Sequence, residues 1–360
     1  MKIEHLSLRN FRNASESEIE FSSGVNVICG ANAAGKTNIL EAIFYFAAGK
    51  SFRNCKDREL ISFGCEKGNI AMRFVTENSV QKMTAVLSKS GRRVIKLGES
   101  APLRMTEYIG RFRAVIFTPD HLSLVKGSPE NRRRFLDLAI CQSFPRYAPT
   151  LSEYNRVLAQ KNALLKRGNV IDELLSVYNE RLAALAAIIT VNRKKYVLKL
   201  EEEAKKFLSD MSNGKESLVL NYQSQIGSFE TQEEIKEKYI NLFNEKMNYE
   251  KERFLALYGS HKDDFAVSIN KKSARMYGSQ GQQRSIVLAL KLAEGELSAK
   301  LTGEYPVFLL DDILSELDKD RKEYILSRIT DRQVIITGCE SEIFESEGRK
   351  ILVRDGKIIQ

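Results

Sequence analysis

Eight consecutive residues near the N-terminus constrain the fold of this chain more than any other feature. Residues 30–37 read GANAAGKT and match G-x-x-x-x-G-K-[ST], the loop that cradles nucleotide phosphates. An apolar, β-rich run at 24–30 precedes the loop, and apolar residues recur at helical spacing from Thr37 until Gly49. The motif therefore has the strand, loop and helix that its chemistry requires, and it predicts a P-loop NTPase.

The chemistry of the loop gives each position a role. Backbone N–H groups turn inward around phosphate oxygens at the positive end of the following helix. Lys36 would reach the β- and γ-phosphates, and the Thr37 hydroxyl would ligate Mg²⁺. An ordinary glycine turn between a strand and a helix is the alternative, but it would not need all eight positions to match. The predicted loop residues are Gly30, Ala31, Asn32, Ala33, Ala34 and Gly35.

A second, acidic element lies far from this loop. Leu309 and Leu310 end an apolar strand that is followed by Asp311 and Asp312. Asp311 would hold Mg²⁺ through water, and Asp312 would polarise the attacking water. Two aspartates after an apolar strand are also common as a strand end or a helix N-cap. Because some 275 residues separate Lys36 from Asp311, the nucleotide fold is split around an insertion, which excludes the compact plan of small GTPases.

Two further motifs narrow the kind of split NTPase. Residues 279–284 read SQGQQR before an apolar helix, and a serine with a glycine at a helix start binds anions. Because this motif lies outside the P-loop, we expect Ser279, Gly281 and Gln282 to grip the γ-phosphate of a nucleotide held by a second copy of the chain. The motif SELD at 315–318 follows the two aspartates, although its first and last residues would also suit a helix cap.

The hydrophobic pattern and the local composition along the chain predict an α/β fold in three segments. Strand-like patterns dominate 1–125, which we expect to be the first part of an ATPase lobe. Residues 126–250 are poor in glycine and rich in charge, and they indicate a mostly helical lobe of two or three helices without a long coiled coil. Residues 251–360 would complete the ATPase lobe and end in a hairpin around Asp355. The expected strands include 69–75, 83–87, 94–97, 114–117, 307–310 and 333–337.

Composition adds mainly exclusions. The chain has 56 Lys+Arg and 47 Asp+Glu, and the net charge of +9 permits an anionic partner without indicating one. The longest apolar runs, 42–48 and 182–189, are too short to span a bilayer, and the N-terminus is too charged for a signal peptide. We therefore expect a cytoplasmic protein without a membrane partner. Scattered cysteines argue for a reducing compartment and against disulfides; they are Cys29, Cys55, Cys65, Cys141 and Cys339.

In combination, these motifs resemble the ABC-type ATPases, and within them the branch of SMC, Rad50 and RecF proteins. GANAAGKTN is similar to the Walker A motif of that branch, SQGQQR to its signature motif, LLDD to Walker B and SELD to the D-loop. The resemblance is closest to the RecF family and covers essentially the whole chain, most weakly at 165–245. It implies an ABC-type ATPase head of mixed sheet with helices, split by the helical lobe. Further segments that carry it are 10–13, 40–43, 118–120, 132–137 and 259–265.

The resemblance also implies roles for individual residues. Asn38 would stand beside the phosphate ligands, and Asp312 occupies the place of a catalytic glutamate in many ABC ATPases. Arg12 resembles an arginine that reaches the nucleotide in Rad50-like proteins, although a surface arginine in a turn is the alternative. Ala33 stands where this group usually has glycine, so its backbone is expected to stay in a region that alanine tolerates. Thr337 lies where transporters of this superfamily carry a switch histidine.

The implied function is a weak, DNA-stimulated ATPase that acts as a switch in recombinational repair. ATP with Mg²⁺ would promote a head-to-tail homodimer that clamps double-stranded DNA at gaps or single-strand/double-strand junctions, and hydrolysis would release it. Like RecF, the protein would help to load a RecA-type recombinase together with RecR and RecO. A salt-bridging helix face is the alternative for the nominated DNA contacts, which are Arg132, Arg133, Arg134 and Lys262.

Three other classes of protein remain as alternatives. An ATPase subunit of a membrane transporter would show an L-S-G-G-Q signature and a switch histidine, where this chain has SQGQQR and Thr337. A Rad50- or SMC-like tether would need hundreds of heptad residues. A P-loop kinase would offer no reason for the motif at 279–284.

Overall fold

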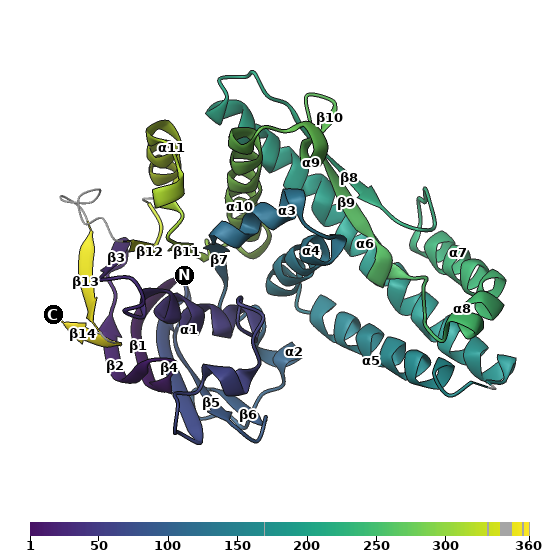
Figure 1. The fold of residues 1–360 in the computed structure, drawn as a ribbon, viewed down its shortest axis with the longest axis horizontal. Coiled ribbons are helices and arrows are strands. Elements are labelled where there is room, and N and C mark those ends of the chain that lie inside the picture. Colours follow the sequence, from purple (N-terminus) through teal and green to yellow (C-terminus); the bar gives the residue numbers. More distant parts are fainter. Residues whose placement is uncertain (169, 330, 339–347, 355, 360) are drawn as a thin grey trace. The chain divides into compact units, whose positions relative to one another are not determined.

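The computed structural model describes residues 1–168, 170–329, 331–338, 348–354 and 356–359. They form two compact units, one from Met1–His121 with Leu288–Gln360 and the other from Leu122–Val287 (Figure 1). The two ends of the sequence therefore build one unit together, and the second unit is an insertion between them. Cys339 and Asp355 lie outside the described residues.

An antiparallel sheet with the strand order β2-β1-β4-β5-β6 forms one layer of the first unit. Alternate residues of these strands are buried, among them Leu6 and Leu8 of β1, because successive side chains of a strand point to opposite faces. The expected strands at 69–75, 83–87 and 94–97 are confirmed. The strands are β1 (Lys2–Phe11), β2 (Ala14–Glu20), β4 (Lys67–Val75), β5 (Val80–Ser88) and β6 (Arg93–Leu97).

A second sheet of this unit has the order β14-β13-β3-β12-β11-β7. Its neighbouring strands run parallel except for the terminal β13–β14 hairpin, which confirms the expected pairing around residue 355. All residues of β3, β7 and β11 are buried, as continuous apolar runs in parallel strands predict. The strands are β3 (Val25–Cys29), β7 (Ala114–Phe117), β11 (Val307–Asp311), β12 (Val334–Gly338), β13 (Arg349–Arg354) and β14 (Lys357–Ile359).

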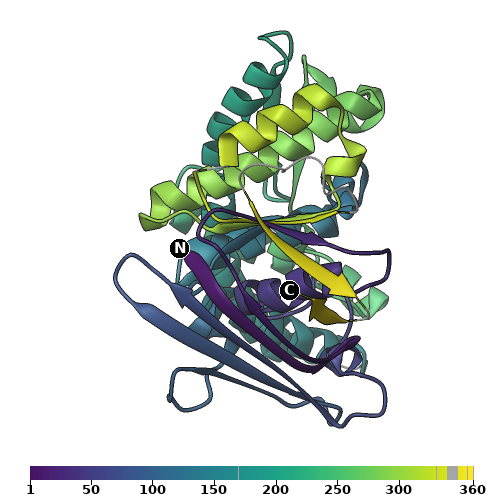
Figure 2. The ribbon, with the colours of Figure 1, turned by 90° about the vertical axis from the view of Figure 1, so that its left-hand side faces the viewer.

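Helix α1 (Lys36–Ala48) lies between the two sheets (Figure 2), and nearly all of its residues are buried. It ends at Gly49, whose φ is 68° and whose N–H donates to Tyr45 O at 2.8 Å, so the expected helix stop is confirmed. On the opposite face of the parallel sheet lie α11 (Lys319–Ile329) and the C-terminal part of α10 (Gln280–Thr302). At Gly295 a Cβ atom would lie 2.3 Å from the Phe308 ring, so glycine permits this close helix–strand packing.

The second unit contains more helices than the sequence predicted. Between residues 129 and 253 the described chain forms five, where we expected two or three. Breaks near Pro145 and at Lys246 explain the difference. The proline is a stop signal that our prediction did not use, whereas no glycine or proline marks the break at Lys246. The helices are α4 (Pro129–Ser143), α5 (Tyr147–Leu165), α6 (Asp172–Met211), α7 (Gln232–Glu245) and α8 (Met247–Arg253).

A small sheet with the order β10-β9-β8 also belongs to the second unit. Strand β9 (Asp264–Ile269) pairs antiparallel with β8 (Leu218–Gln223), and this pairing ties residues beyond 250 to the helical insertion. The compact units consequently divide at 121 and 287, whereas the sequence was divided at 125 and 250. The remaining short elements are β10 (Lys272–Ser273), η1 (Asp57–Leu60), α2 (Met105–Tyr108), η2 (Pro119–Leu122), α3 (Ser123–Lys126), η3 (Ser260–Lys262), α9 (Ala274–Tyr277) and η4 (Leu314–Glu316).

Helix α6 is long and apolar enough to cross a membrane by length and composition alone. Its apolar stripe nevertheless packs inside the unit, where Leu182, Ile189, Tyr196 and Leu200 are at most 2% exposed. The neighbouring elements that contact it include α5, α7 and β8. This environment is that of a core helix.

Candidate functional site

The loop between β3 and α1 needs glycine at both of its ends. Gly30 has φ +157°, and a Cβ atom there would lie 2.3 Å from Val353 O on β13. Gly35 has φ +110°, and its Cβ would lie 2.7 Å from the side-chain oxygen of Asn13. The loop is therefore held between the C-terminal strand and the β1–β2 turn, and larger side chains at either end would displace it.

Ala33 differs from our expectation. Its φ is +63°, which is the left-handed region, so the backbone does not stay where alanine is comfortable. We expected an intact loop with the backbone of residue 33 in a region that alanine tolerates. Instead the neighbouring contacts keep the loop in the conformation that suits glycine, and alanine adopts it at a cost.

Lys36 points back over the loop. Its Nζ donates to Gly30 O at 2.7 Å and to Ala31 O at 3.0 Å, and the residue is only 8% exposed. A cavity of about 450 Å³ opens beside it. We call it the phosphate cavity. Its lining residues are Asn32, Ala33, Ala34, Gly35, Lys36, Thr37, Asn38, Arg53, Asp312 and Thr337.

Asp311 brings the two distant motifs together. Its Oδ1 accepts hydrogen bonds from Thr37 Oγ1 at 2.8 Å and from Thr337 Oγ1 at 2.9 Å. Thr337 is opposite Asp311 in the parallel register of β11 and β12, which places its hydroxyl at the carboxylate. Burial raises the pKa of Asp311, while the two hydroxyl donors and Arg53 oppose the rise. This oxygen set suits Mg²⁺, which binds few protein carboxylates and completes its shell with phosphate oxygens and water.

Asp312 lies beside this group but in a different environment. It is exposed, lines the phosphate cavity and has φ +52°. Its N–H donates to Thr337 Oγ1 at 3.1 Å, which anchors the turn at the end of β11. The left-handed turn therefore sends two consecutive carboxylates to different places, one buried at the threonine hydroxyls and one facing the cavity.

Arg12 does not line the phosphate cavity. Its Nε and Nη2 donate to the two carboxylate oxygens of buried Glu41 at 2.8 and 2.7 Å, and its Nη1 donates to Glu59 O at 3.0 Å. The hydrogen bond that Arg12 donates to Glu41 raises the pKa of Arg12. The guanidinium thus forms a partly buried ion pair at the edge of a neighbouring cavity, and its contact with a nucleotide stays a prediction.

Sequence reasoning missed Arg53, which lines the phosphate cavity from the segment after α1. Its Nη1 donates to Asn38 Oδ1 at 2.8 Å and lies 3.5 Å from a carboxylate oxygen of Glu41. Asn38 in turn donates to Asn13 Oδ1 at 2.8 Å. No motif marks residue 53, and only its position after the P-loop helix could have suggested it.

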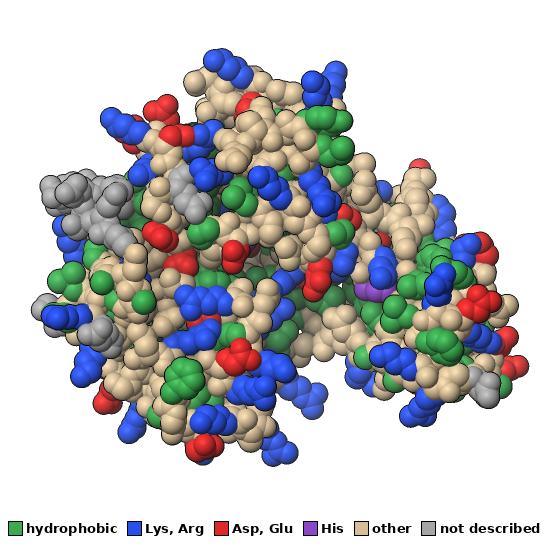
Figure 3. Space-filling view, viewed as in Figure 1, with side chains coloured by type: hydrophobic (Ala, Val, Ile, Leu, Met, Phe, Trp, Pro, Cys, Tyr) green, Lys and Arg blue, Asp and Glu red, His purple; other side chains and the backbone are tan. Residues whose placement is uncertain are grey.

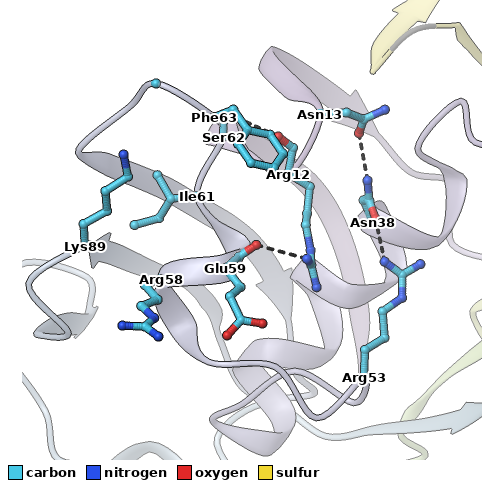
Figure 4. A pocket seen from close by; sticks show the side chains of 11 residues that line it. Arg12, Asn13, Asn38, Arg53, Arg58, Glu59, Ile61, Ser62, Phe63 and Lys89 are labelled. Atoms are coloured by element: carbon cyan, nitrogen blue, oxygen red, sulfur yellow. Dashed lines mark hydrogen bonds between the residues drawn. The ribbon is translucent and has the colours of Figure 1, made fainter.

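A larger cavity of about 850 Å³ adjoins this chain of contacts (Figure 4). Asn38 and Arg53 line both cavities, so the two spaces meet at these side chains. In Figure 4, Phe63 lies between Lys89 on one side and Asn38 on the other. The other residues that line it are Arg12, Asn13, Arg58, Glu59, Ile61, Ser62 and Gly64.

The SQGQQR and SELD motifs form helix starts. Ser279 N–H donates to Gln282 Oε1 at 2.9 Å and Gln282 N–H donates to Ser279 Oγ at 3.2 Å, a reciprocal capping box at α10. Ser279 is exposed, and Gly281 lies in the first turn. Asp318 Oδ1 accepts from Arg321 N–H at 3.0 Å and caps α11, as the structural alternative proposed. The Glu316 side chain lies outside the described residues.

The nominated DNA contacts of the second unit fall into different environments. Arg132 is 5% exposed, and its Nε and Nη2 donate to the two carboxylate oxygens of Asp264 at 2.7 and 2.8 Å. This burial favours the salt-bridging alternative for Arg132. Arg133 and Arg134 are half-buried, and Lys262 is exposed.

Comparisons with known proteins identify the family. The family model described as RecF/RecN/SMC N terminal domain matches residues 2–357. The DNA replication and repair protein RecF of Clostridium kluyveri is 39% identical over 366 residues, which cover 99% of each chain. This chain belongs to the RecF family. RecF of Staphylococcus carnosus is 38% identical over the full length of both chains.

Solved structures agree with this membership. The structure of the recombination mediator protein RecF-ATP in the RecFOR pathway has a TM-score of 0.93 to this RecF-family chain, with 35% identity over 99% of it and 97% of the other. An Smc head bound to the C-winged helix domain of ScpA shares the fold at a TM-score of 0.59 and 17% identity. The expected ABC-type head, split by a helical insertion, is therefore confirmed.

Proposed function

We propose that this RecF-family chain is an ATP-driven switch that binds double-stranded DNA in recombinational repair. The observation that carries the proposal is the phosphate cavity, where Lys36 and Thr37 meet Asp311 and Asp312 from 275 residues further along the chain. A dinuclear or acid–base site of another kind would need different residues. The names of the relatives, DNA replication and repair protein RecF, support the DNA process.

ATP hydrolysis would use five side chains, four that line the cavity and Asp311 beside it. Lys36 now donates hydrogen bonds to the carbonyl oxygens of Gly30 and Ala31. On ATP binding it would donate them to oxygens of the β- and γ-phosphates instead, because these oxygens also accept hydrogen bonds from an ammonium group. Thr37 and Asp311 would hold Mg²⁺, which neutralises the charge that develops on the phosphates. Asp312 would orient the attacking water, and Arg53, which also lines the cavity, would contact a phosphate.

The nucleoside would occupy the 850 Å³ cavity. Its position next to the phosphate cavity follows from the shared Asn38 and Arg53. Arg12 would border this space, held in place by Glu41.

A second copy of the chain would complete the reaction centre. Ser279, Gly281 and Gln282 begin α10, and backbone N–H groups at a helix start favour an anion. These groups would contact the γ-phosphate of the ATP bound by the second copy. Two copies would thereby associate head-to-tail around DNA, and ATP hydrolysis would separate them.

The DNA contacts and protein partners extend this proposal. Basic and acidic side chains are interspersed on the face in Figure 3, so a DNA contact on this face would be local. Exposed Lys262 and half-buried Arg133 and Arg134 are the candidates that burial leaves accessible. The RecFOR pathway named for a solved relative supports RecO and RecR as the proposed partners. With them, the protein would load a RecA-type recombinase at gaps or junctions in the cytoplasm.

Light scattering with and without ATP, and with and without a gapped duplex, tests the switch. We expect a monomer that becomes a dimer with ATP and Mg²⁺, and a further gain in dimer with DNA. Lys36→Met should stay monomeric, whereas Lys56→Met, an exposed lysine of the same unit that lines neither cavity, should behave as wild type. A wild-type monomer under all four conditions would contradict the proposal.

A further inference from the structure

Phe63 occupies an unusual position for a large apolar side chain. It is fully exposed, with a relative accessibility of 105%. A tight turn holds it there, since Cys65 N–H donates to Ser62 O at 3.1 Å and Gly64 adopts φ +80°. The ring is therefore presented to solvent by the backbone of the turn and is not packed into the unit.

The surroundings of the ring suggest what it meets. Phe63 lines the 850 Å³ cavity together with the buried side chain of Ile61. This cavity joins the phosphate cavity at Asn38 and Arg53. A triphosphate bound at Lys36 would carry its sugar and base into the space that Phe63 borders.

Two of the polar residues beside the ring, Ser62 and Asn13, are already engaged with the protein. Ser62 Oγ donates to Arg12 O at 2.8 Å, and Ser62 N–H donates to Asn10 O at 3.0 Å. The side-chain amide of Asn13 donates to Ala34 O at 3.1 Å and accepts from Asn38. In Figure 4 the carboxylate of Glu59 points away from Phe63. These groups are poorly placed to distinguish one base edge from another.

We propose that Phe63 is the stacking platform for the nucleotide base, and that the site recognises the flat face of a purine without reading its edge. The inference rests on the proposed ATP site and adds its base specificity. Stacking on an aromatic ring tolerates different bases because every base has a π-face. Purines stack over a larger area than pyrimidines, so ATP and GTP should bind similarly and more tightly than CTP and UTP.

The test measures the affinity of the full chain for ATP, GTP, CTP and inorganic tripolyphosphate, each with Mg²⁺, by titration calorimetry. Phe63→Ala should weaken the binding of ATP and GTP roughly 5- to 150-fold, which is the range for losing one base stack. Tripolyphosphate affinity should not change, because it has no base. Phe63→Tyr should retain the affinity for ATP, and Val80→Ala, an exposed apolar residue outside both cavities, should behave as wild type.

Three outcomes would overturn the inference. They are an unchanged ATP affinity in Phe63→Ala, an equal loss for ATP and tripolyphosphate, and a wild-type preference for ATP over GTP above tenfold. Because the ring is fully exposed, the thermal stability of Phe63→Ala should match wild type, which separates a lost contact from a lost fold. A wild-type chain that binds neither ATP nor tripolyphosphate would instead overturn the proposed nucleotide site.

Discussion

Asp312 can be altered without disturbing the turn that presents it. Its backbone is left-handed, and asparagine adopts that region more readily than most residues. We therefore expect Asp312→Asn to fold and bind ATP normally but to lose the negative charge that orients water. Its hydrolysis rate should fall at least tenfold, and the ATP-bound dimer should persist on DNA. A phosphate-release assay with wild-type rates would remove Asp312 from the chemistry.

Ala33 offers a test of strain in the loop. A left-handed alanine costs about 1–2 kcal/mol of stability. Glycine removes this cost but offsets part of the gain, because it has more conformational freedom in the unfolded chain. Ala33→Gly should therefore raise the free energy of unfolding by about 1 kcal/mol and keep or improve nucleotide affinity. Chemical denaturation measures the first effect, with Ala31→Gly as the control in the same loop. A less stable Ala33→Gly variant would show that the alanine side chain makes a compensating contact.

His261 predicts a pH dependence in the second unit. Burial lowers its pKa to about 4. Its Nδ1 lies 2.8 Å from Tyr154 Oη, and its Nε2 lies 3.3 Å from Ala256 O. Because the unfolded pKa is about 6.5, protonation favours the unfolded chain. The contribution of neutral His261 is complete above pH 6.5 and is lost as the pH falls toward 4.

His261→Gln should remove this dependence while keeping one donor and one acceptor. Its free energy of unfolding should fall less steeply with decreasing pH than that of wild type between about pH 6.5 and pH 4. The difference between the two slopes should correspond to the uptake of at most one proton on unfolding. Denaturant melts of both proteins across this range compare the slopes. Identical slopes would show that His261 titrates normally in the folded protein.

At the scale of elements, the start of α10 combines a structural and a proposed functional role in Ser279. Aspartate also caps helices well, so Ser279→Asp should leave the fold intact. Its negative charge would oppose a γ-phosphate from a second copy, and ATP-dependent dimerisation should be lost while ATP binding remains. Ser279→Thr keeps a neutral cap and should dimerise. An ATP-dependent dimer of Ser279→Asp in light scattering would refute the arrangement in trans.

Local patterns predicted elements well where one segment carried its own signal. The run before Gly30, the helix up to Gly49 and the apolar strand before Asp311 all needed only their own residues. Strand β8 was missed, because Asn221 and neighbouring polar residues weaken its apolar alternation. It is defined by pairing with β9, more than 40 residues later, and local reasoning does not see such a partner.

The residues of the candidate site likewise divide into those that the sequence predicted and those that it did not. The motif residues Lys36, Thr37 and Asp311 were predicted, and the structure joins Thr37 to Asp311 by a hydrogen bond. Arg53 and Phe63 belong to no motif, and their positions beside the cavities depend on how the segment after α1 folds back. Sequence reasoning finds groups whose spacing along the chain reflects their chemistry. It misses groups that only tertiary structure places.

At the scale of the whole molecule, the two units should differ in autonomy. Residues 122–287 are continuous in sequence and include α4–α8 and their sheet. Expressed alone, they should give a helical protein with a cooperative thermal transition. Residues 1–121 should not, since β3 and β7 are separated in the parallel sheet by β12 and β11, which this fragment lacks. Circular dichroism of the two fragments checks both, and a cooperative melt of 1–121 would contradict this account.

The position of β3 also has a consequence for biosynthesis. This strand leads into the phosphate loop, and both of its neighbours, β12 and β13, lie roughly 300 residues further along the chain. A ribosome completes the loop early, but the strands that flank β3 and the Val353 carbonyl that lies against Gly30 are made much later. The nascent chain should consequently remain unable to capture nucleotide until β12 and β13 have been made, so that partly made heads cannot engage ATP or one another.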